Sequence, residues 1–453
     1  MNLPNYFLAD LPPEATLTAP MIEEACQTLK RNRQIYLAPR STRSLIELLD
    51  HLAKNWLEPE YPFRKAALEE GPAATGFSRP TLAAGLDSFF RQVTRDNLNA
   101  LIEQDLGDPQ RLDQMTAAQV EAKSGRASMA IAPEFLAHIA AGNIPNPTLH
   151  SVMLGLLTRS AQFVKCGAGA SLLPRLFAHS VYEADTKLGA CLEIAAWRGG
   201  NATLENALFA HADCVTATGS DETLGAIRGR LPAAARFLGY GHRVSFGFVT
   251  SRVLSGMNGR KVAARAAADV AAWNQLGCLS PHVIYVESGG ALTPEQFAEL
   301  LAEELALREQ SEPRGELPVE AAAAIASRRS FYEIRAAHSP DTRHWCSPDS
   351  TAWTVVFEAD PRFQVSCLNR FVYVKSVKDT AEMLQNADPV RNEVSTVGLA
   401  ATEDKAEELA GELARWGASR VCPLGRMQQP PLGWRHDGRP ALGDLVRWSD
   451  WEQ

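Results

Sequence analysis

The chain has 453 residues, of which 45% are hydrophobic and 22% charged, and its formal net charge is −8. This length accommodates two domains or one large α/β unit with a sizeable core. The negative charge argues against nucleic acid or an anionic membrane surface as the main partner.

The sequence also lacks the signals of membrane insertion and secretion. No stretch approaches the roughly 20 apolar residues of a membrane span, and the N-terminus has neither the basic start nor the apolar run of a signal peptide. Eight scattered cysteines without CxxC spacing indicate thiols in a reducing compartment. We therefore expect a cytoplasmic protein without a metal site.

Helical and strand patterns follow one another along the first half of the chain. Residues 20–55 and 81–106 have the periodicity of amphipathic helices, separated by a stretch that contains Pro and Gly (57–80). From about residue 134, strands are expected at 134–141, 161–167 and 212–220, and helices at 149–157, 171–189 and 221–231. This alternation predicts a parallel doubly wound sheet.

A second α/β block begins at residues 244–287. Its Ala-rich helix is expected at 261–273 and its first apolar strand at 282–287. Further strands are expected at 352–359, 363–377 and 419–425, and a helix at 401–417. The last 28 residues are rich in Pro, Gly and Trp, and we expect an ordered tail on the surface.

Cys278 stands out among the cysteines because of its setting. It lies between the Ala-rich helix and the apolar strand, with Gly277 before it and Ser280-Pro281 after it. A thiol at such a junction can be exposed to a substrate and act as a nucleophile, whereas most single cysteines in proteins are inert core residues.

Two further candidates follow expected strands. Asn143 precedes Ile144-Pro145, and its amide is suited to donate to a developing oxyanion, although an Asn that satisfies its own turn is commoner. Lys165 ends a strand and is suited to contact ribose or phosphate oxygens, although a solvated lysine is the simpler reading. The turn after Lys165 has no carboxylate to chelate the ribose of NAD, which favours NADPH.

Weaker signals come from two other turns. Thr218-Gly219-Ser220 ends a strand and opens a helix, so its N–H groups can face a pyrophosphate, or the turn is purely structural. His242 and Arg243 are candidates for a base or a substrate contact, or for ordinary loop residues.

Several motifs, taken in order, resemble one family. They are AGNIP, FVKCGAGASLLPRLFAHSV, WRGGNATLE, TGSDETLGAIRGRLP, GYGHRVSFGFV, NQLGCLSPHVIYVE and PLGWRHDGRPALGDLVRW. Together they resemble the acyl-CoA reductases of the LuxC family, the reductase component of the bacterial fatty-acid reductase that makes aldehyde for luminescence. That family belongs to the aldehyde dehydrogenase superfamily, and the resemblance extends from about residue 130 to the C-terminus.

The resemblance implies an aldehyde-dehydrogenase-like α/β fold with a small oligomerisation element. Residues 1–243 would hold the N-terminal helices and a modified Rossmann NAD(P)-binding domain. Residues 244–420 would form the catalytic domain with the nucleophilic cysteine, and residues 421–453 a tail that packs back on these domains. By analogy with the superfamily, we expect a homodimer or a homotetramer.

The resemblance also implies roles for the candidate residues. Cys278 matches the nucleophile and Asn143 the oxyanion donor. Lys165 matches the lysine at the adenosine ribose, and Gly219 and Ser220 match the turn over the pyrophosphate. Thr218 and Gly225 complete the expected cofactor set.

One departure from the superfamily bears on the reaction. Where hydrolytic aldehyde dehydrogenases carry Glu-Leu-Gly-Gly, this chain has Tyr240-Gly241-His242-Arg243, without a carboxylate to activate water. This absence suits an enzyme that passes its acyl group to hydride.

We therefore expect NADPH-dependent reduction of an acyl-CoA, or of an enzyme-bound acyl thioester, to the aldehyde through acyl-Cys278. CoA would be part of the substrate, and NADH is the alternative cofactor. Two other functions stay open: an NAD(P)-dependent aldehyde dehydrogenase that produces acid, and an acyl-accepting subunit that works with an acyl-protein synthetase partner.

Overall fold

The computed structural model describes residues 3–12, 14–140, 142, 144–255 and 258–452. The chain forms two compact units: the first contains Met1–Thr75, Leu86–Gly241 and Pro431–Gln453, and the second contains Gly76–Gly85 and His242–Pro430. No helix within the described ranges is long and apolar enough to cross a membrane.

The first unit is built on a parallel five-stranded sheet in the order β4-β3-β2-β5-β6. The strands are β2 (Phe135–Ile139), β3 (Ala161–Cys166), β4 (Leu192–Ala196), β5 (Cys214–Thr218) and β6 (Arg236–Tyr240). The chain runs outward from β2 to β4 and then continues on the other side with β5 and β6. The strand order therefore reverses between β2 and β5, and ligands of such sheets bind at the carboxyl ends of the strands at this position. The predicted doubly wound sheet is confirmed.

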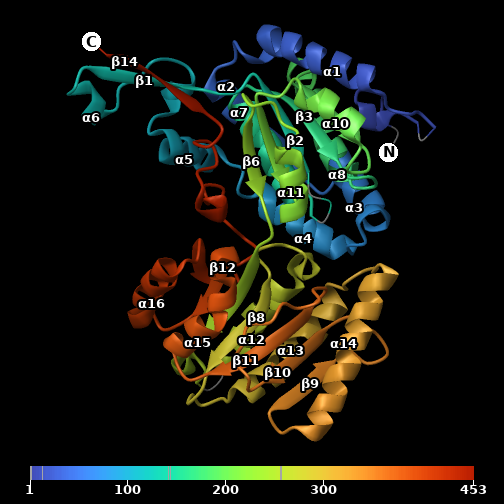
Figure 1. Ribbon diagram of the computed structural model, residues 1–453, viewed down its shortest axis with the longest axis vertical. Helices are drawn as coiled ribbons and strands as arrows, with labels where there is room; N and C mark the ends of the chain where they lie inside the picture. Colours follow the sequence, from blue (N-terminus) through green and yellow to red (C-terminus); the bar gives the residue numbers. More distant parts are fainter. Residues whose placement is uncertain (1–2, 13, 141, 143, 256–257, 453) are drawn as a thin grey trace. The chain divides into compact units, whose positions relative to one another are not determined.

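Helices cover both faces of this sheet (Figure 1). One face packs its apolar residues against α1, α10 and α11, and the other against α7 and α8, which in turn contact α2. The helices assigned to the first unit are α1 (Ala19–Asn32), α2 (Thr42–Leu57), α3 (Pro62–Thr75), α5 (Arg95–Leu106), α6 (Gln119–Ala122), α7 (Asn146–Leu157), α8 (Leu172–Ala184), α9 (Thr186–Gly189), α10 (Ala202–Phe209) and α11 (Asp221–Arg228). α4 (Arg79–Phe90) begins in the second unit and ends in the first.

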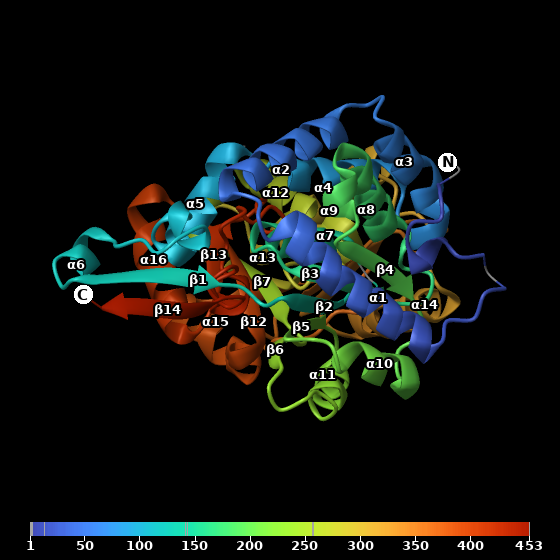
Figure 2. The same ribbon diagram turned by 90° about the horizontal axis from the view of Figure 1, so that it is seen from above.

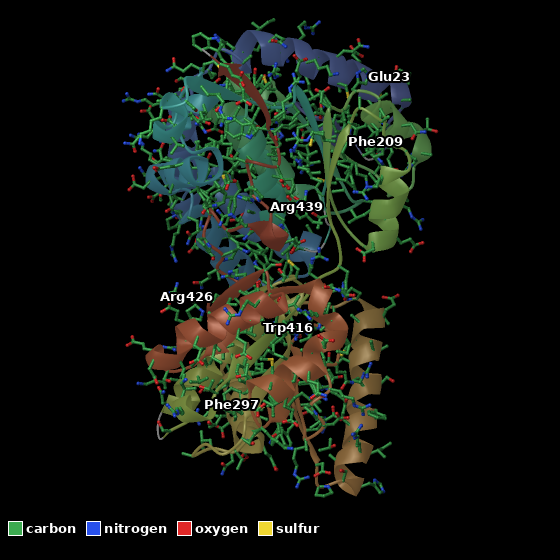
Figure 3. All side chains as sticks on the ribbon, turned by 60° about the vertical axis from the view of Figure 1, so that its left-hand side comes forward. Glu23, Phe209, Phe297, Trp416, Arg426 and Arg439 are labelled. Atoms are coloured by element: carbon green, nitrogen blue, oxygen red, sulfur yellow. The ribbon has the colours of Figure 1, made fainter. Side chains whose placement is uncertain are left out.

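The C-terminal segment belongs to the first unit. Its last strand, β14 (Arg447–Glu452), pairs antiparallel with β1 (Arg126–Ile131), and this ribbon projects from the rest of the unit (Figures 1 and 2). Before the ribbon, the N–H of Leu442 donates to Asp105 and Arg236 donates to the carbonyl of Val446. Arg439, labelled in Figure 3, lies on the same segment.

The second unit contains a seven-stranded sheet in the order β13-β12-β7-β8-β11-β10-β9, parallel except for the edge strand β9. Its strands are β7 (Val244–Val249), β8 (Pro281–Glu287), β9 (Thr342–Cys346), β10 (Thr354–Glu358), β11 (Phe371–Val377), β12 (Val394–Ala400) and β13 (Arg420–Pro423). Six of the seven residues of β8 are buried, as expected for a central parallel strand covered on both faces.

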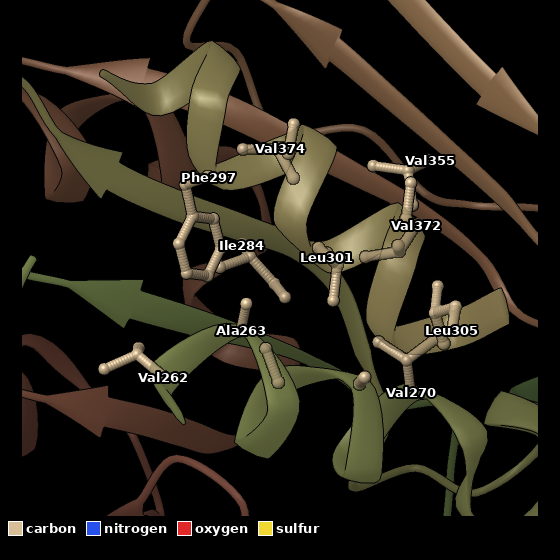
Figure 4. Packing of buried hydrophobic residues seen from close by; sticks show 14 of the residues in the cluster. Val262, Ala263, Val270, Ile284, Phe297, Leu301, Leu305, Val355, Val372 and Val374 are labelled. Carbon is tan, nitrogen blue, oxygen red and sulfur yellow. The ribbon is translucent and has the colours of Figure 1, made fainter. Parts of the chain in front are cut away.

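Two apolar clusters lie on opposite faces of this sheet. The first joins α12 (Asn258–Ala271) and α13 (Pro294–Ser311) to β8, β10 and β11, and Figure 4 shows Phe297 and Leu301 of α13 beside Ile284. The second holds side chains of α14 (Val319–His338), α15 (Thr380–Ala387) and α16 (Glu403–Trp416), including Trp416, labelled in Figure 3.

The structure corrects two expectations about secondary structure. The stretch 57–80 is not a bare connection, because α3 forms there with Pro62 in its first turn, where the missing N–H costs nothing, and buries Phe63. The strand expected at 363–377 begins only at Phe371, because Leu368, Asn369 and Arg370 have φ angles of 60°, 56° and 66° and turn the chain.

Candidate active site

Cys278 lies in a turn between a short 3-10 helix (Ala272–Gln275) and β8, the junction that the sequence predicts, and its side chain is half-buried. The N–H of Ser280 donates to the carbonyl of Gly277 at 3.0 Å and closes the turn. The hydroxyl of Ser245 in β7 donates to the carbonyl of Cys278 at 2.7 Å. The position of the thiol is therefore set by its own backbone, which is bound to the neighbouring strand.

The residues just before this turn have an unusual backbone. Trp273, Asn274 and Gln275 have φ angles of 49°, 50° and 64°, in the left-handed region that costs about 1–2 kcal/mol per residue for a residue with a Cβ. The side chain of Asn274 supports this conformation, because its amide donates to the carbonyl of Arg314 at 2.7 Å. Such strain, when over-determined by its surroundings, is typical of functional sites.

A second left-handed run, Leu368–Arg370, is joined to the first by a side chain. Nε of Arg370 donates to the side-chain oxygen Oδ1 of Asn274 at 3.1 Å, and Nη1 of Arg370 pairs with Glu309 at 2.8 Å. The Arg370 side chain is 1% exposed. The two strained turns therefore support each other through one buried guanidinium.

His282, near the start of β8, is a residue that the sequence analysis did not single out. Its Nδ1 accepts the backbone N–H of Ser366 at 3.1 Å, so in the neutral ring the proton is on Nε2. Burial lowers the pKa of His282 to about 4, and the charge of His242 adds to this effect. His282 therefore stays neutral near pH 7, and it ties the loop before β11 to the strand that follows Cys278.

His242 and Arg243 come directly before β7. His242 is exposed, Arg243 is half-buried, and Nη1 of Arg243 donates to the carbonyl of His242 at 3.0 Å. Because Ser245, two residues later, contacts Cys278, this segment lies at the same end of the second sheet as the thiol.

Burial raises the pKa of five of the other thiols far above neutral pH. Burial raises the pKa of Cys26, Cys166 and Cys191 to about 12, and that of Cys214 and Cys422 to about 11. Thiols with such pKa values are protonated at neutral pH and are poor nucleophiles.

Lys165 lies in β3 of the first unit and is only 5% exposed. Burial lowers the pKa of its ammonium group, opposed by the charges of Glu205 and Cys166. Nζ lies 5.7 Å from the ring centroid of Trp197, and among the described residues it has no hydrogen-bond partner and no ion pair. A buried ammonium group without such partners is suited to contact a polar ligand.

The loop after β4 adds two residues that the sequence analysis did not assign. Trp197 has a buried Nε1 without a hydrogen-bond partner among the described residues, and Arg198 is exposed. The nearby carboxylate of Glu205 accepts the N–H of Gly200 at 3.0 Å and pairs with Arg230 at 2.5 Å. Trp197 and Arg198 belong to the motif WRGGN, which lies between a strand and a helix and is one of the motifs that resemble the family. This motif was the sequence signal from which both residues could have been predicted.

Two polar groups of the Thr218-Gly219-Ser220 turn already make hydrogen bonds within the fold. The N–H of Gly219 donates to the carbonyl of Tyr240 at 3.2 Å, and Ser220 caps α11 by accepting the N–H of Thr223. Gly225 is exposed within α11. An anion at this turn would therefore have to use donors other than the Gly219 N–H.

The structure groups the predicted residues by unit. Cys278, His242 and Arg243 belong to the second unit. The cofactor candidates, which are Lys165, Thr218, Gly219, Ser220 and Gly225, belong to the first. Asn143, expected as oxyanion donor, lies outside the described residues.

Known sequences identify the family of this chain. Residues 37–448 match the family described as acyl-CoA reductase (LuxC). The chain belongs to this family. Among its relatives, the long-chain acyl-protein thioester reductase of Vibrio harveyi is 22% identical over 92% of this chain and 84% of that protein. The corresponding protein of Aliivibrio fischeri is 22% identical over 90% of this chain and 82% of that protein.

Solved structures confirm the aldehyde-dehydrogenase-like fold of this LuxC family member. The NADP-dependent glyceraldehyde-3-phosphate dehydrogenase from Bacillus halodurans has a TM-score of 0.72 at 13% identity, over 96% of this chain and 92% of that one. A protein of Anabaena variabilis assigned as the aldehyde dehydrogenase PutA has a TM-score of 0.68 at 15% identity, over 96% and 93%. Bifunctional proline utilization A has a TM-score of 0.71 at 15% identity over 96% of this chain, which spans 45% of that protein.

Proposed function

We propose that this protein reduces an acyl thioester to the aldehyde with NADPH through a covalent acyl-Cys278 intermediate. The observation that carries the proposal is the half-buried Cys278 thiol on a turn whose carbonyl is bound by Ser245. Family membership supports the reaction class, because the family is described as acyl-CoA reductase.

In the first half-reaction, the Cys278 thiolate attacks the thioester carbonyl. A bond forms between Sγ and the acyl carbon, the bond to the leaving sulfur breaks, and the released thiol takes up a proton. The N–H of Cys278 and the amide of Asn143 would donate to the oxyanion. Because Ser245 holds the carbonyl of Cys278, it limits rotation of the backbone that positions the thiol.

The second half-reaction needs a nicotinamide cofactor, which supplies a hydride when bound. Lys165, Trp197 and Arg198 fit such a group, because Lys165 and the buried Nε1 of Trp197 lack hydrogen-bond partners among the described residues. Arg198, exposed beside them, would favour the additional phosphate of NADPH. After reduction, Cys278 leaves as the thiol when the thiohemiacetal carbon forms the aldehyde.

The segment before β7 supports reduction over hydrolysis. Tyr240, Gly241, His242 and Arg243 provide no carboxylate to activate water. An acyl-enzyme without such a base should be long-lived enough to be reduced. This argues against the alternative of an aldehyde dehydrogenase that releases acid.

The carrier of the acyl group is either CoA or a protein thiol. The family description refers to acyl-CoA, and the Vibrio harveyi relative is an acyl-protein thioester reductase. Both substrates present the same thioester carbonyl, so the chemistry at Cys278 is common to them. A role as acyl acceptor beside an acyl-protein synthetase partner would use the same thiol, and we propose assembly as a homodimer or homotetramer.

The proposal is tested by NADPH oxidation with acyl-CoAs of increasing chain length, with the aldehyde measured in parallel. Cys278→Ala should abolish aldehyde formation, whereas Cys346→Ala, a change at another half-buried cysteine, should not. Aldehyde formation by Cys278→Ala would overturn the mechanism. A stable acyl adduct on Cys278 without turnover would favour the acyl-accepting alternative.

A further inference from the structure

A cavity of about 350 Å³ lies within the second unit, on the face of its sheet that α14 covers. None of its lining residues belongs to the Cys278 turn. They come from α14, from the carboxyl-terminal parts of β10 and β11, and from the loop between these strands. The cavity therefore lies toward the carboxyl ends of β10 and β11, the end of the strands near which ligands of open α/β sheets bind.

The cavity has a charged lining in an otherwise apolar layer. Glu358 and Lys375 lie opposite each other in the register of β10 and β11 and form an ion pair of 2.5 Å, with side chains 3% and 2% exposed. Arg335 pairs with the same carboxylate at 3.2 Å. A buried ion pair is often no more stable than a well-packed apolar pair, so fold stability alone does not explain these charges.

Positive charge exceeds negative charge around the cavity. Four cations, Arg328, Arg335, Arg362 and Lys375, face two carboxylates, Glu358 and Asp360. Arg362 is engaged by Asp360 at 2.5 Å, whereas Arg328 has no ion pair with any residue that the structure describes. This local excess of two positive charges, in a chain of net charge −8, favours an anionic ligand.

Aromatic side chains complete the lining. Phe331 of α14 is 52% exposed, and Phe363 of the loop is partly buried. Aromatic rings stack on nucleic bases, and arginine forks match phosphate oxygens. The volume lies within the usual range of small-molecule sites, about 300–1,000 Å³.

We propose that this cavity binds a phosphorylated adenine nucleotide, with its phosphates on Arg328 and the neighbouring cations and its base on Phe331. Two sources share this chemistry: the 3′-phospho-ADP end of CoA and a free adenine nucleotide. The first source rests on the proposed function, because an acyl-CoA substrate would bring the nucleotide to the second unit.

The spacing along the strands is compatible with the CoA source. Lys375 is level with Tyr285 of β8, four residues beyond Pro281, which corresponds to about 13 Å along the strand. The pantetheine arm of CoA has the length of a four-residue extended chain, roughly 14 Å. In addition, the loop that lines the cavity continues to Ser366, which contacts His282, four residues after Cys278.

The test is the affinity of the full-length protein for 3′,5′-ADP, measured by calorimetry. Arg328→Ala and Phe331→Ala should each raise Kd at least tenfold. Both side chains are exposed, so neither change should impair folding. Arg415→Ala, at an exposed arginine of α16 outside the cavity, is the matched control and should leave Kd unchanged. Absence of 3′,5′-ADP binding, or binding that neither variant weakens, would overturn the proposal.

Two further measurements distinguish CoA from a free adenine nucleotide as the ligand. If CoA is the ligand, Arg328→Ala should also raise the KM for acyl-CoA. If a free nucleotide is the ligand, ADP should bind as tightly as 3′,5′-ADP and the KM should not change. Cys278→Ala should retain 3′,5′-ADP binding, so failure of the reductase assay and failure of the cavity proposal give different results.

Discussion

The hydroxyl of Ser245 donates a 2.7 Å hydrogen bond to the carbonyl oxygen of Cys278. The same Oγ accepts the N–H of Thr396 at 3.1 Å, and Ser245 is fully buried. One side chain thus connects β7, β12 and the turn that carries the thiol. The placement of Cys278 therefore depends on the sheet and not only on its own loop.

Replacing Ser245 by alanine should both destabilise the protein and loosen this turn. The change leaves the carbonyl of Cys278 and the N–H of Thr396 buried without this partner, which should lower the free energy of unfolding by about 2–4 kcal/mol. Urea unfolding measures this loss, and the rate of Cys278 alkylation reports the position of the thiol. Ser419→Ala, at an exposed serine, should change neither. A Ser245→Ala protein as stable as the parent would contradict the role assigned to this hydroxyl.

Asn274 offers a paired test of the strained backbone. Asn274→Ala removes the contacts to Arg314 and Arg370, and should lower the free energy of unfolding by about 2–4 kcal/mol. Asn274→Gly loses the same contacts but has no Cβ to oppose the left-handed φ of 50°, so it should be about 1 kcal/mol more stable than the alanine variant. Denaturant titration of both variants decides this, and equal stabilities would show that the φ angle costs little.

The buried His282 should make stability depend on pH. Its pKa is lowered from 6.5 to about 4, so between these values the unfolded chain binds a proton that the native protein does not. Above pH 6.5 the buried His282 has no effect on the free energy of unfolding. As the pH falls below 6.5, its lowered pKa reduces that free energy increasingly, by about 3 kcal/mol near pH 4. His282→Gln removes it, so the difference in unfolding free energy between the variant and the parent should shift in the variant's favour from pH 7.5 to pH 5. A difference that does not vary with pH would refute the assignment.

Arg198 should select between the two nicotinamide cofactors under the proposed function. Its exposed guanidinium lies in the loop beside Lys165 and can contact the 2′-phosphate that NADPH carries and NADH lacks. Arg198→Ala should weaken the binding of 2′,5′-ADP about tenfold and leave NADH binding unchanged. Fluorescence titration with both ligands measures this. Equal losses for the two ligands would indicate a general structural effect of the change.

Local patterns were sufficient for much of the fold. The strands β2, β3, β5 and β8 and the helices α12 and α16 lie close to their predicted ranges. Their apolar runs, helical periods and flanking turn residues are all contained in short windows of sequence. The edge strand β9 was missed because its residues, Thr342–Cys346, are mostly polar or half-buried and lack a clear alternation.

The candidate site also has residues that the local sequence predicts and contacts that it does not. Cys278 and Lys165 could be selected from their neighbours in the chain, because a thiol or an ammonium group at the end of an element is a local signal. The contacts that position the thiol could not, since Ser245, Arg370 and Ser366 reach partners 33, 96 and 84 residues away.

The sequence by itself therefore determined the class of fold, the family and the candidate thiol. The tertiary structure alone decided which side chains hold that thiol and where cations gather around the cavity. Strand pairing brings together residues that are far apart in the chain, such as Glu358 and Lys375, and the burial that follows sets their electrostatics. Neither the pairing nor the burial is a property of a short segment, so no local pattern can reveal it.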